Sequence, residues 1–288
     1  MGAFAAGMKR EQQWLKRMTN SLRLSKPPLY NHLLLTEDQR ERLDVVLVSP
    51  RNPLNIGAVA RAMANFGFAR LTVVAPYAPH WREARSAVGA PELLAHARET
   101  ATLADAVAQC TLVAGTGTLT YRKPEQGVVQ LPELAPMIAA ELTRGGRVAL
   151  VFGPEKHGLT REDLSYCHML VEIPTDPRQP SMNLGQAVAV CLYELAVRAC
   201  PADVNPQKTA LKGATPSGTL DLLAGVVEQT MQAAGYSPHT MQAANRHDLR
   251  LMLRRLALSQ PDARRILGLF RRVLWRLNRL PGCDDKSY

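Results

Sequence analysis

Short apolar runs rich in β-branched residues recur through the middle of the chain and alternate with longer stretches of helical periodicity. The runs occupy residues 43–48, 71–75, 111–114, 147–152 and 169–173. Runs that are apolar at nearly every position predict strands buried on both faces, and helices between such strands predict parallel pairing. The pattern therefore predicts an α/β fold, in which a mostly parallel sheet has helices on both faces.

Two of the intervening stretches have a clear apolar face. In the first, Asn55 is the predicted N-cap and Arg61 points away from a face that comprises Ile56, Val59, Ala60, Met63 and Phe66. In the second, Asn183 and Gln186 resemble a capping box before a face that comprises Leu184, Val188, Cys191, Leu192 and Leu195. Asn183 is therefore expected at the positive end of a helix dipole.

Changes in this pattern divide the chain into four parts. Residues 1–42 are basic and precede the first strand, so we expect an N-terminal extension. Residues 43–200 carry the α/β pattern. Residues 201–218 lack periodicity and are rich in Pro, Gly, Lys and Ala, which predicts a linker. Residues 219–288 show helical periodicity alone and are too few for a large core, so we expect a small helical domain that packs on something else.

The chain is basic, since 35 Lys and Arg against 25 Asp and Glu give a formal charge of +10. This balance favours a polyanionic partner such as nucleic acid. Arginines recur on the faces of two C-terminal helices with few acids nearby in the sequence, although a solvated polar face is the alternative. Trp275, beside the second stripe, is predicted to be a core residue. The arginines predicted to contact RNA phosphates are Arg246, Arg250, Arg254, Arg265, Arg272 and Arg276.

The cysteine and hydropathy patterns bear on compartment and metals. The five cysteines include no Cys-x-x-Cys pair and no Cys/His cluster of zinc-site spacing, so we expect a reducing cytoplasm and no metal. No apolar run approaches the roughly 18 residues of a membrane span. Charged residues also interrupt the N-terminal segment before a signal-peptide core forms. We therefore expect a soluble cytoplasmic protein with no membrane partner.

Three loops follow predicted strands and carry glycine, proline and polar residues. Loop 153–160 has the spacing of a P-loop, but Leu159 stands where that motif needs lysine, so nucleotide hydrolysis is not expected. Glu155 in this loop is either a general base or a structural hydrogen-bond acceptor, and we favour the acceptor. Loop 116–118 and the proline-stiffened segment 173–181 follow other strands. Because the carboxyl ends of parallel strands meet at one edge, the loops predict one ligand site.

Three ordered motifs in residues 44–198 carry a family resemblance. They are N-x-G-A-V-A-R-A with N-F-G (55–67), F-G-P-E-x-x-G-L (152–159), and I-P with S-M-N-L-x-x-A-V-A and Y-E-x-x-R (173–198). In this order they resemble the SPOUT superfamily of RNA 2′-O-ribose methyltransferases, TrmH-like branch. Residues 227–236 and 253–256 are similar to a bacterial subfamily that methylates tRNA cytidine and uridine in the anticodon loop.

The resemblance implies a fold and a cofactor that the pattern alone does not. The C-terminal part of the α/β domain is expected to thread a trefoil knot, a rare exception to unknotted topology. A homodimer is implied, with S-adenosylmethionine bound in the knot. The residues implied to bind this cofactor are Thr116, Gly117, Thr118, Gly153, Ile173, Ser181, Met182 and Leu184.

The same resemblance assigns catalytic roles. Arg61 matches the family's catalytic arginine, which stabilises the developing alkoxide and, in the dimer, acts on cofactor held by the other protomer. Asn55 positions Arg61 or the backbone, Ser181 and Asn183 orient the ribose and the cofactor, and Glu155 holds the knot loop or supports the site. The implied substrate is the pyrimidine at position 32 of tRNA. Ribosomal RNA and the tRNA D-loop are alternative substrates, and a non-catalytic RNA-binding protein on the same scaffold is an alternative of another class.

Overall fold

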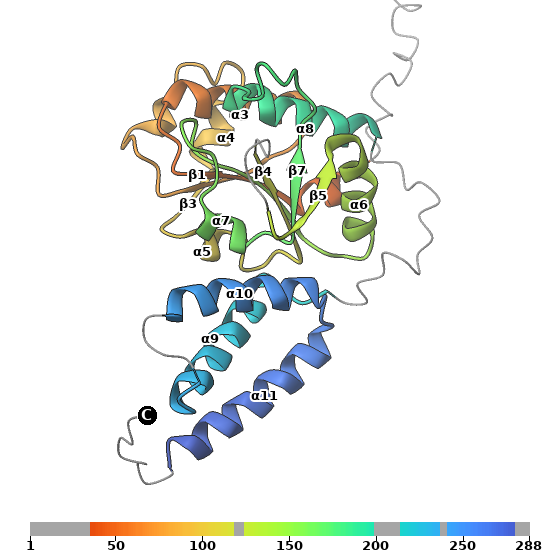
Figure 1. Ribbon diagram of the computed structural model, residues 1–288. Helices are drawn as coiled ribbons and strands as arrows, with labels where there is room; N and C mark the ends of the chain where they lie inside the picture. The colour runs from red at the N-terminus through yellow and green to blue at the C-terminus, as the bar shows by residue number, and fades with distance from the viewer. Residues whose placement is uncertain (1–34, 118–123, 199–213, 237–240, 280–288) are drawn as a thin grey trace, which may run out of the picture.

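The computed structural model describes residues 35–117, 124–198, 214–236 and 241–279. Seven strands in this part form one sheet in the order β3-β2-β1-β6-β4-β7-β5, and each neighbouring pair is parallel (Figure 1). The strands are β1 (Leu43–Val48), β2 (Arg70–Val74), β3 (Arg98–Thr100), β4 (Leu112–Thr116), β5 (Gly127–Gln130), β6 (Val148–Phe152) and β7 (Met169–Glu172). The α/β class and the mostly parallel sheet are therefore as predicted.

Helices cover both faces of this sheet. Helices α3 (Pro53–Asn65), α4 (Pro91–Ala95), α6 (Leu131–Thr143) and α8 (Leu184–Arg198), with the short η1 (Trp81–Glu83), pack on one face. Helices α5 (Leu103–Val107) and α7 (Arg161–Ser165) lie on the other, and α2 (Glu37–Arg40) precedes β1. The two faces have separate cores because successive strand residues point to opposite sides, so Val45 and Leu47 join one core and Val46 and Val48 the other.

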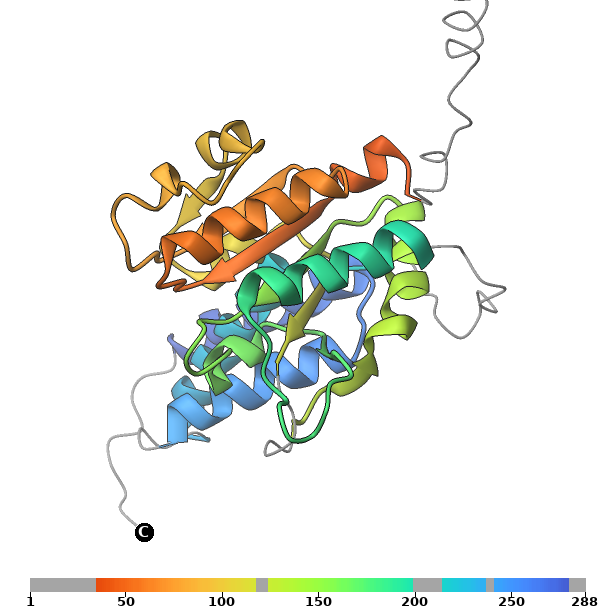
Figure 2. The same ribbon diagram turned by 90° about the horizontal axis from the view of Figure 1, so that it is seen from above.

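Helices α3 and α8 lie side by side over the centre of the sheet (Figure 2). Their approach depends on Gly185, where an added Cβ would lie 2.8 Å from the Cβ of Ala58. A side chain at this position would push the two helices apart. The beginnings of α3 and α8 are thereby held together above the carboxyl edge of β1 and β6.

Three helices follow the α/β unit: α9 (Ser217–Ala233), α10 (Gln242–Arg255) and α11 (Gln260–Leu277). They share a small core of their own around Leu223, Leu253 and Leu267. The first residue of α9 contacts the α/β unit. Ser217 donates a backbone and a hydroxyl hydrogen bond to Cys110 O, at 2.9 and 3.0 Å. None of the helices in the described part is long and apolar enough to cross a membrane.

All five predicted strands are confirmed, and the remaining differences have physical causes. The sequence analysis missed β3 and β5, whose residues are largely exposed because both strands lie at the edges of the sheet. The predicted N-cap Asn55 is wrong. Asn52 caps α3 instead, accepting from Leu54 N at 2.9 Å, because Pro53 suits the first helical position. Residues 35–42 pack on the α/β unit, and Leu35 is 2% exposed.

His168, just before β7, gives the fold a pH dependence. Its Nδ1 accepts a hydrogen bond from Val113 N at 3.1 Å, which requires an unprotonated ring nitrogen. Burial, with a smaller contribution from the Arg254 cation, lowers the pKa of His168 from 6.5 to about 3. Between these two pKa values the unfolded chain therefore binds a proton that the folded chain does not. The contribution of neutral His168 to stability is complete above the unfolded pKa, and it is lost as pH falls towards the folded pKa.

We expect the free energy of unfolding to decrease by up to about 1.4 kcal/mol for each pH unit below about pH 6.5 because of this one group. Urea unfolding measured between about pH 7 and pH 4.5 checks this slope. The His168→Asn variant keeps an acceptor oxygen near the Nδ1 position but does not titrate there, so its slope should be shallower. Equal slopes for the two proteins would assign the pH dependence to other groups.

Candidate active site

One pocket lies at the carboxyl edge of the sheet, where the neighbouring strands β6, β4 and β7 end. Its volume is about 270 Å³. The strands end at Phe152, Thr116 and Glu172, and all three residues line the pocket. Open α/β sheets bind their ligands at this edge, so the pocket is the leading candidate for the active site.

The structure brings the predicted cofactor residues together around this pocket. Those that line it are Thr116, Gly117, Gly153, Ile173, Ser181, Met182 and Leu184. Thr118 lies outside the described residues. Nine further lining residues were not predicted to belong to a cofactor site: Phe152, Pro154, Lys156, His157, Gly158, Glu172, Thr175, Pro180 and Ala187. Most of them belong to loops 153–160 and 173–181, which were already predicted to bind a ligand. Their position beside the predicted residues could therefore have identified them.

Gly153 makes the sharp turn after β6 possible. A Cβ at this position would lie 2.2 Å from Leu159 N and 2.3 Å from Gly158 C, distances that backbone atoms cannot accommodate. Gly158 itself has a φ of 62°, a left-handed conformation that favours glycine. The loop therefore folds back on itself at the base of the pocket, and its two glycines are required by its shape.

The proline-rich segment after β7 forms the facing wall of the pocket. Thr175 Oγ1 donates to Pro180 O at 3.3 Å, and Gln179 N donates to Asp176 O at 2.9 Å, so the segment forms a closed turn. Few backbone N–H groups are available here because three of the residues are prolines. Ser181, at the end of this turn, lines the pocket with its side chain exposed.

Glu155 connects the pocket loop to the beginnings of two helices. Its carboxylate accepts hydrogen bonds from Arg51 N at 3.1 Å, Asn52 N at 3.2 Å and Asn55 Nδ2 at 2.9 Å. Asn55 Oδ1 accepts in turn from Asn183 Nδ2 at 3.0 Å. Asn183 Oδ1 accepts from the backbone of α8, at 2.9 Å from Gly185 N, as the predicted cap does. The side chains of residues 155, 55 and 183 thus form one chain of hydrogen bonds.

The ionisation of Glu155 bears on its role. Burial acts to raise its pKa, but hydrogen bonds from the Asn55 side chain and from backbone N–H groups outweigh burial, and the pKa is lowered from its ordinary value of 4.5. A general base works best with a pKa near the operating pH, whereas this carboxylate is held as a weakly basic anion. The geometry thus agrees with the structural role that the sequence analysis favoured for Glu155.

Arg61 lies on α3 outside this pocket. Its side chain is exposed, and it does not belong to the residues that line the pocket of this single chain. It belongs to the same helix as Asn55, whose side chain joins the network of Glu155. A reaction that uses both Arg61 and this pocket therefore needs either a bound substrate between them or a second copy of the chain.

The three arginines of α10 that were predicted to contact RNA have acidic partners within the protein, so the expectation that few acids pair with them is wrong. Arg254 is buried, donating to Asp221 Oδ1 at 2.9 Å and to Tyr166 O at 3.1 Å. Arg250 pairs with Glu162 on α7, and Arg246 pairs with Glu228 on α9 at 2.9 Å. In three dimensions these arginines face acids from distant parts of the sequence, and they dock α10 on α7 and α9.

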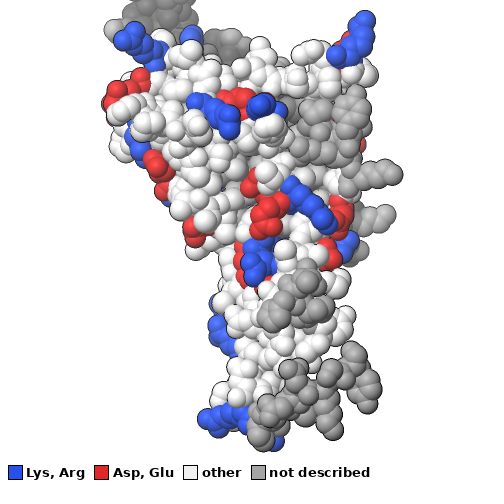
Figure 3. Space-filling model, turned by 60° about the vertical axis from the view of Figure 1, so that its left-hand side comes forward, with Lys and Arg blue, Asp and Glu red and all other residues white. Residues whose placement is uncertain are grey.

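Helix α11 differs from α10. Within the described part of the chain, no carboxylate pairs with its arginines Arg264, Arg265, Arg271, Arg272 and Arg276, or with Arg279 just beyond its end. Trp275 is 39% exposed between the guanidinium groups of Arg272 and Arg279, each 4.1 Å from its ring, so the core assignment of Trp275 is wrong. In Figure 3, basic and acidic atoms mix at the junction with the α/β unit, and basic atoms alone mark the lower end of the helices.

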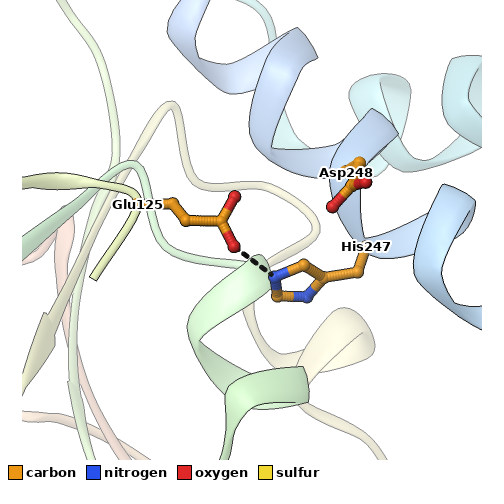
Figure 4. A group of neighbouring side chains, drawn as sticks. All are labelled: Glu125, His247 and Asp248. Carbon is orange, nitrogen blue, oxygen red and sulfur yellow. Dashed lines mark ion pairs between the residues drawn. The ribbon is translucent and has the colours of Figure 1, made fainter. Parts of the chain in front are cut away.

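A second contact joins α10 to Glu125, just before β5. Figure 4 shows His247 on α10 directed at Glu125, with Nε2 to Oε1 at 3.6 Å and Asp248 beside them. These three residues are spaced closely enough to be candidate metal ligands, a grouping absent from the predictions because Glu125 is far from the other two in the chain. The same oxygen of Glu125 also pairs with Arg161 Nη2 at 3.3 Å, so this carboxylate contacts both α7 and α10.

A parallel α/β sheet with a ligand pocket at the ends of three adjacent strands defines the general class of protein, and comparisons define the family. The model of the SpoU rRNA methylase family matches residues 42–193. The crystal structure of TrmJ from Z. mobilis ZM4 superposes with a TM-score of 0.70 and 29% sequence identity, covering 80% of this chain and 98% of that one. The chain belongs to the SpoU rRNA methylase family.

Two curated relatives extend this comparison. The tRNA (cytidine/uridine-2′-O-)-methyltransferase TrmJ of Citrobacter koseri is 33% identical over 240 residues, 81% of this chain and 95% of the relative. The tRNA (cytidine/uridine/adenosine-2′-O-)-methyltransferase TrmJ of Pseudomonas aeruginosa is 40% identical over 169 residues, 58% of this chain and 65% of the relative. The expected resemblance to SPOUT methyltransferases that use S-adenosylmethionine is thereby confirmed.

We expect Arg254→Ala to lower the free energy of unfolding by about 3–5 kcal/mol, because it leaves Asp221 without its cation at a buried contact between helices. Urea unfolding followed by circular dichroism measures the change. Arg255→Ala is the matched control, since the neighbouring Arg255 is exposed and should change stability by no more than about 0.5 kcal/mol. Equal decreases in the two variants would contradict the docking role of Arg254.

Proposed function

We propose that this protein transfers a methyl group from S-adenosylmethionine to a ribose 2′-hydroxyl of tRNA, at the pyrimidine in position 32 that opens the anticodon loop. The observation that carries the proposal is the pocket at the carboxyl edge of the sheet, in a chain of a methylase family. The match to the Citrobacter relative covers 81% of the chain and so extends beyond the residues of the family model. The named substrate of that relative therefore supports tRNA over other RNAs.

The residues of the pocket fit this cofactor. Ile173, Met182 and Leu184 offer apolar surface for a planar base. The tight turn at Gly153, which has no side chain, exposes backbone atoms to the same pocket. The hydroxyl of Thr116 donates to Val151 O at 3.1 Å, so its proton is already used in a hydrogen bond within the protein. Thr116 therefore contributes to the shape of the pocket wall. When bound, the cofactor supplies an electrophilic methyl group on a sulfonium. Ser181, exposed at the rim, orients the ribose or the cofactor.

The ribose hydroxyl is a weak acid, so the enzyme must stabilise negative charge that develops on its oxygen. Arg61 is the group proposed for this task, because a guanidinium stays charged and donates several hydrogen bonds in a fixed geometry. Asn55, one turn and a half before it on α3, fixes the helix through the hydrogen bonds to Glu155 and Asn183. Both asparagines and Glu155 therefore act in this proposal as positioning residues.

A homodimer completes the proposed site. Arg61 is exposed outside the pocket of its own chain, and apolar side chains are exposed on the same two helices, with Leu54 57% exposed on α3 and Tyr193 and Val197 49% and 47% exposed on α8. A second copy that covers this surface buries the apolar side chains and brings its Arg61 towards the pocket. The proposal assigns the pocket to one protomer and the arginine to its partner.

The trefoil knot and the division into domains are further parts of the proposal. β7 lies between β4 and β5 in the sheet although both precede it in the chain, and α8 then returns to pack beside α3. This path of the chain supports a knot in which the chain after β7 passes through the loop that follows β6. We propose 1–42, 43–200, 201–218 and 219–288 as extension, methyltransferase domain, linker and helical domain, with the last boundary moved to Ser217, where α9 begins. The proposed location is the cytoplasm, where the tRNA substrate is found.

The surface proposed to bind tRNA lies on α11. Its arginines have no carboxylate partners within the described residues, and Trp275 is exposed among them. Unpaired guanidinium groups on one exposed helix suit phosphate contacts. The proposal therefore keeps Arg265, Arg272 and Arg276 as RNA-binding residues and reassigns Arg246, Arg250 and Arg254 to docking within the protein.

The function is tested by incubating purified protein with total tRNA and ribosomal RNA and methyl-labelled S-adenosylmethionine, then mapping labelled nucleosides by mass spectrometry. We expect label in a 2′-O-methylpyrimidine at position 32 of tRNA. Label elsewhere in tRNA would overturn the position, and label in ribosomal RNA would overturn the tRNA substrate and keep the reaction. Cofactor binding without transfer to any RNA would favour a non-catalytic RNA-binding protein.

Arg61→Ala is the control variant for this assay. It should reduce the rate of transfer by about 10²- to 10³-fold, the usual cost of removing one preorganised donor to a developing negative charge. Binding of S-adenosylmethionine should stay within a factor of two, because Arg61 does not line the pocket. A rate within twofold of the original would refute the role of Arg61.

Replacing Arg265, Arg272 and Arg276 together by Gln should weaken tRNA binding and reduce the slope of log K against log salt by roughly 0.7–0.9 for each phosphate that these arginines neutralise. Filter binding over a salt series measures this slope. The matched control replaces Arg82, Arg144 and Arg198 by Gln, which removes the same charge from arginines that pair with carboxylates in the α/β unit. An equal decrease in both triple variants would show that only net charge matters.

A further inference from the structure

A second pocket lies at the opposite edge of the sheet from the candidate active site. This basal pocket is lined by Asp44, Arg70, Arg98, Ala106, Gln109, Cys110 and Arg147, and its volume is about 260 Å³. β1, β2 and β3 begin at or beside three of these residues, and β6 begins directly after Arg147. Because the strands are parallel, their amino ends meet here, a full strand length away from the pocket at their carboxyl ends.

The basal pocket contains more positive than negative charge. Asp44 is 4% exposed, and both of its carboxylate oxygens are occupied, by Arg70 Nε at 2.8 Å and Arg147 Nη2 at 3.3 Å. Arg98 instead donates to Thr72 Oγ1 at 3.4 Å and to Ala106 O. Three guanidinium groups and one carboxylate leave an excess of two positive charges, and no other carboxylate in the described part of the chain pairs with these arginines.

The remaining polar groups of the basal pocket do not offset this charge. Burial, and then the nearby Asp44, raise the pKa of Cys110 to about 12, so its thiol is neutral at physiological pH. Gln109 is exposed and uncharged. Each guanidinium carries five N–H donors, and the hydrogen bonds of Arg70 and Arg147 to Asp44 use one nitrogen each. The basal pocket therefore offers unused donors in a partly enclosed, cationic setting.

We propose that the basal pocket binds a phosphate group. The planar fork of a guanidinium matches two oxygens of a phosphate, and an excess of two positive charges matches a phosphate monoester dianion. A phosphodiester of an RNA backbone presents the same oxygens with one charge. The occupant is thus either a small phosphate compound or a phosphate of RNA, and both neutralise cations that otherwise repel one another. This proposal does not depend on the methyl-transfer reaction.

The basal pocket borders the junction with the C-terminal helices. The segment that contains Gln109 and Cys110 accepts the first hydrogen bonds of α9, with Gly218 N to Ala108 O at 3.0 Å beside those of Ser217. A phosphate held by Arg98 and Arg147 therefore lies next to the point where α9 meets the α/β unit. This position lets an occupant stabilise both parts of the chain.

The test is calorimetric titration of the full chain with inorganic phosphate at low ionic strength, with sodium chloride of equal ionic strength as reference. We expect saturable binding at the basal pocket, weakened at least tenfold in Arg98→Gln and unchanged in Arg85→Gln, a matched removal of one exposed arginine elsewhere. The triple α11 variant should keep this binding. Asp44→Asn should bind phosphate more tightly because it removes the one negative charge of the pocket, an outcome that loss of folding cannot imitate.

A salt series with tRNA separates the two sources of phosphate. If Arg98→Gln also reduces the salt slope of tRNA binding by the amount expected for about one phosphate, the occupant is an RNA phosphodiester. If Arg98→Gln abolishes phosphate binding and leaves the slope unchanged, the occupant is a small phosphate compound. If the unmodified chain takes up no phosphate, or Arg98→Gln binds it equally well, the basal pocket is an internal ion-pair cluster and the proposal is wrong.

Discussion

The carboxylate of Glu155 is the interaction on which the geometry of the candidate site depends. One anion accepts hydrogen bonds from two backbone N–H groups before α3 and from the side chain of Asn55. Through Asn55 it also reaches Asn183, which caps α8. The pocket loop and the beginnings of two helices are therefore fixed to one another by a single group. Its lowered pKa follows from the same hydrogen bonds, so the ionised form and this geometry stabilise each other.

A parallel sheet concentrates function at its two edges. All seven strands run in one direction, so every loop that leaves the sheet towards the pocket does so at one edge. At the other edge, charged residues lie at or beside the starts of four strands: Asp44 in β1, Arg70 in β2, Arg98 in β3 and Arg147 just before β6. The same topology thus places the candidate pocket, with its glycine turns, at one end and the arginine-lined basal pocket at the other.

The parts of this fold that the sequence predicts are those in which burial leaves a local pattern. β1, β4 and β6 are buried at every position, so their apolar runs are visible in the sequence, whereas the edge strands β3 and β5 leave no such run. The pocket residues were found through their motifs and the family resemblance. The hydrogen bond between Asn55 and Asn183 was not predicted, because the two residues lie at the beginnings of different helices far apart in the sequence and no local pattern relates them.

The arginine stripes show why charge cannot be interpreted from one helix alone. In the sequence, α10 and α11 carry similar stripes, yet Arg254 is buried against Asp221 while Arg276 is exposed. The difference arises from what packs on each helix: α7 and α9 present carboxylates to α10, whereas α11 contacts mainly the apolar face of α9. A cation is available for a phosphate only where the fold provides no acid for it. By this criterion, α11 and Arg98 of the basal pocket offer cations that pair with no acid within the described residues.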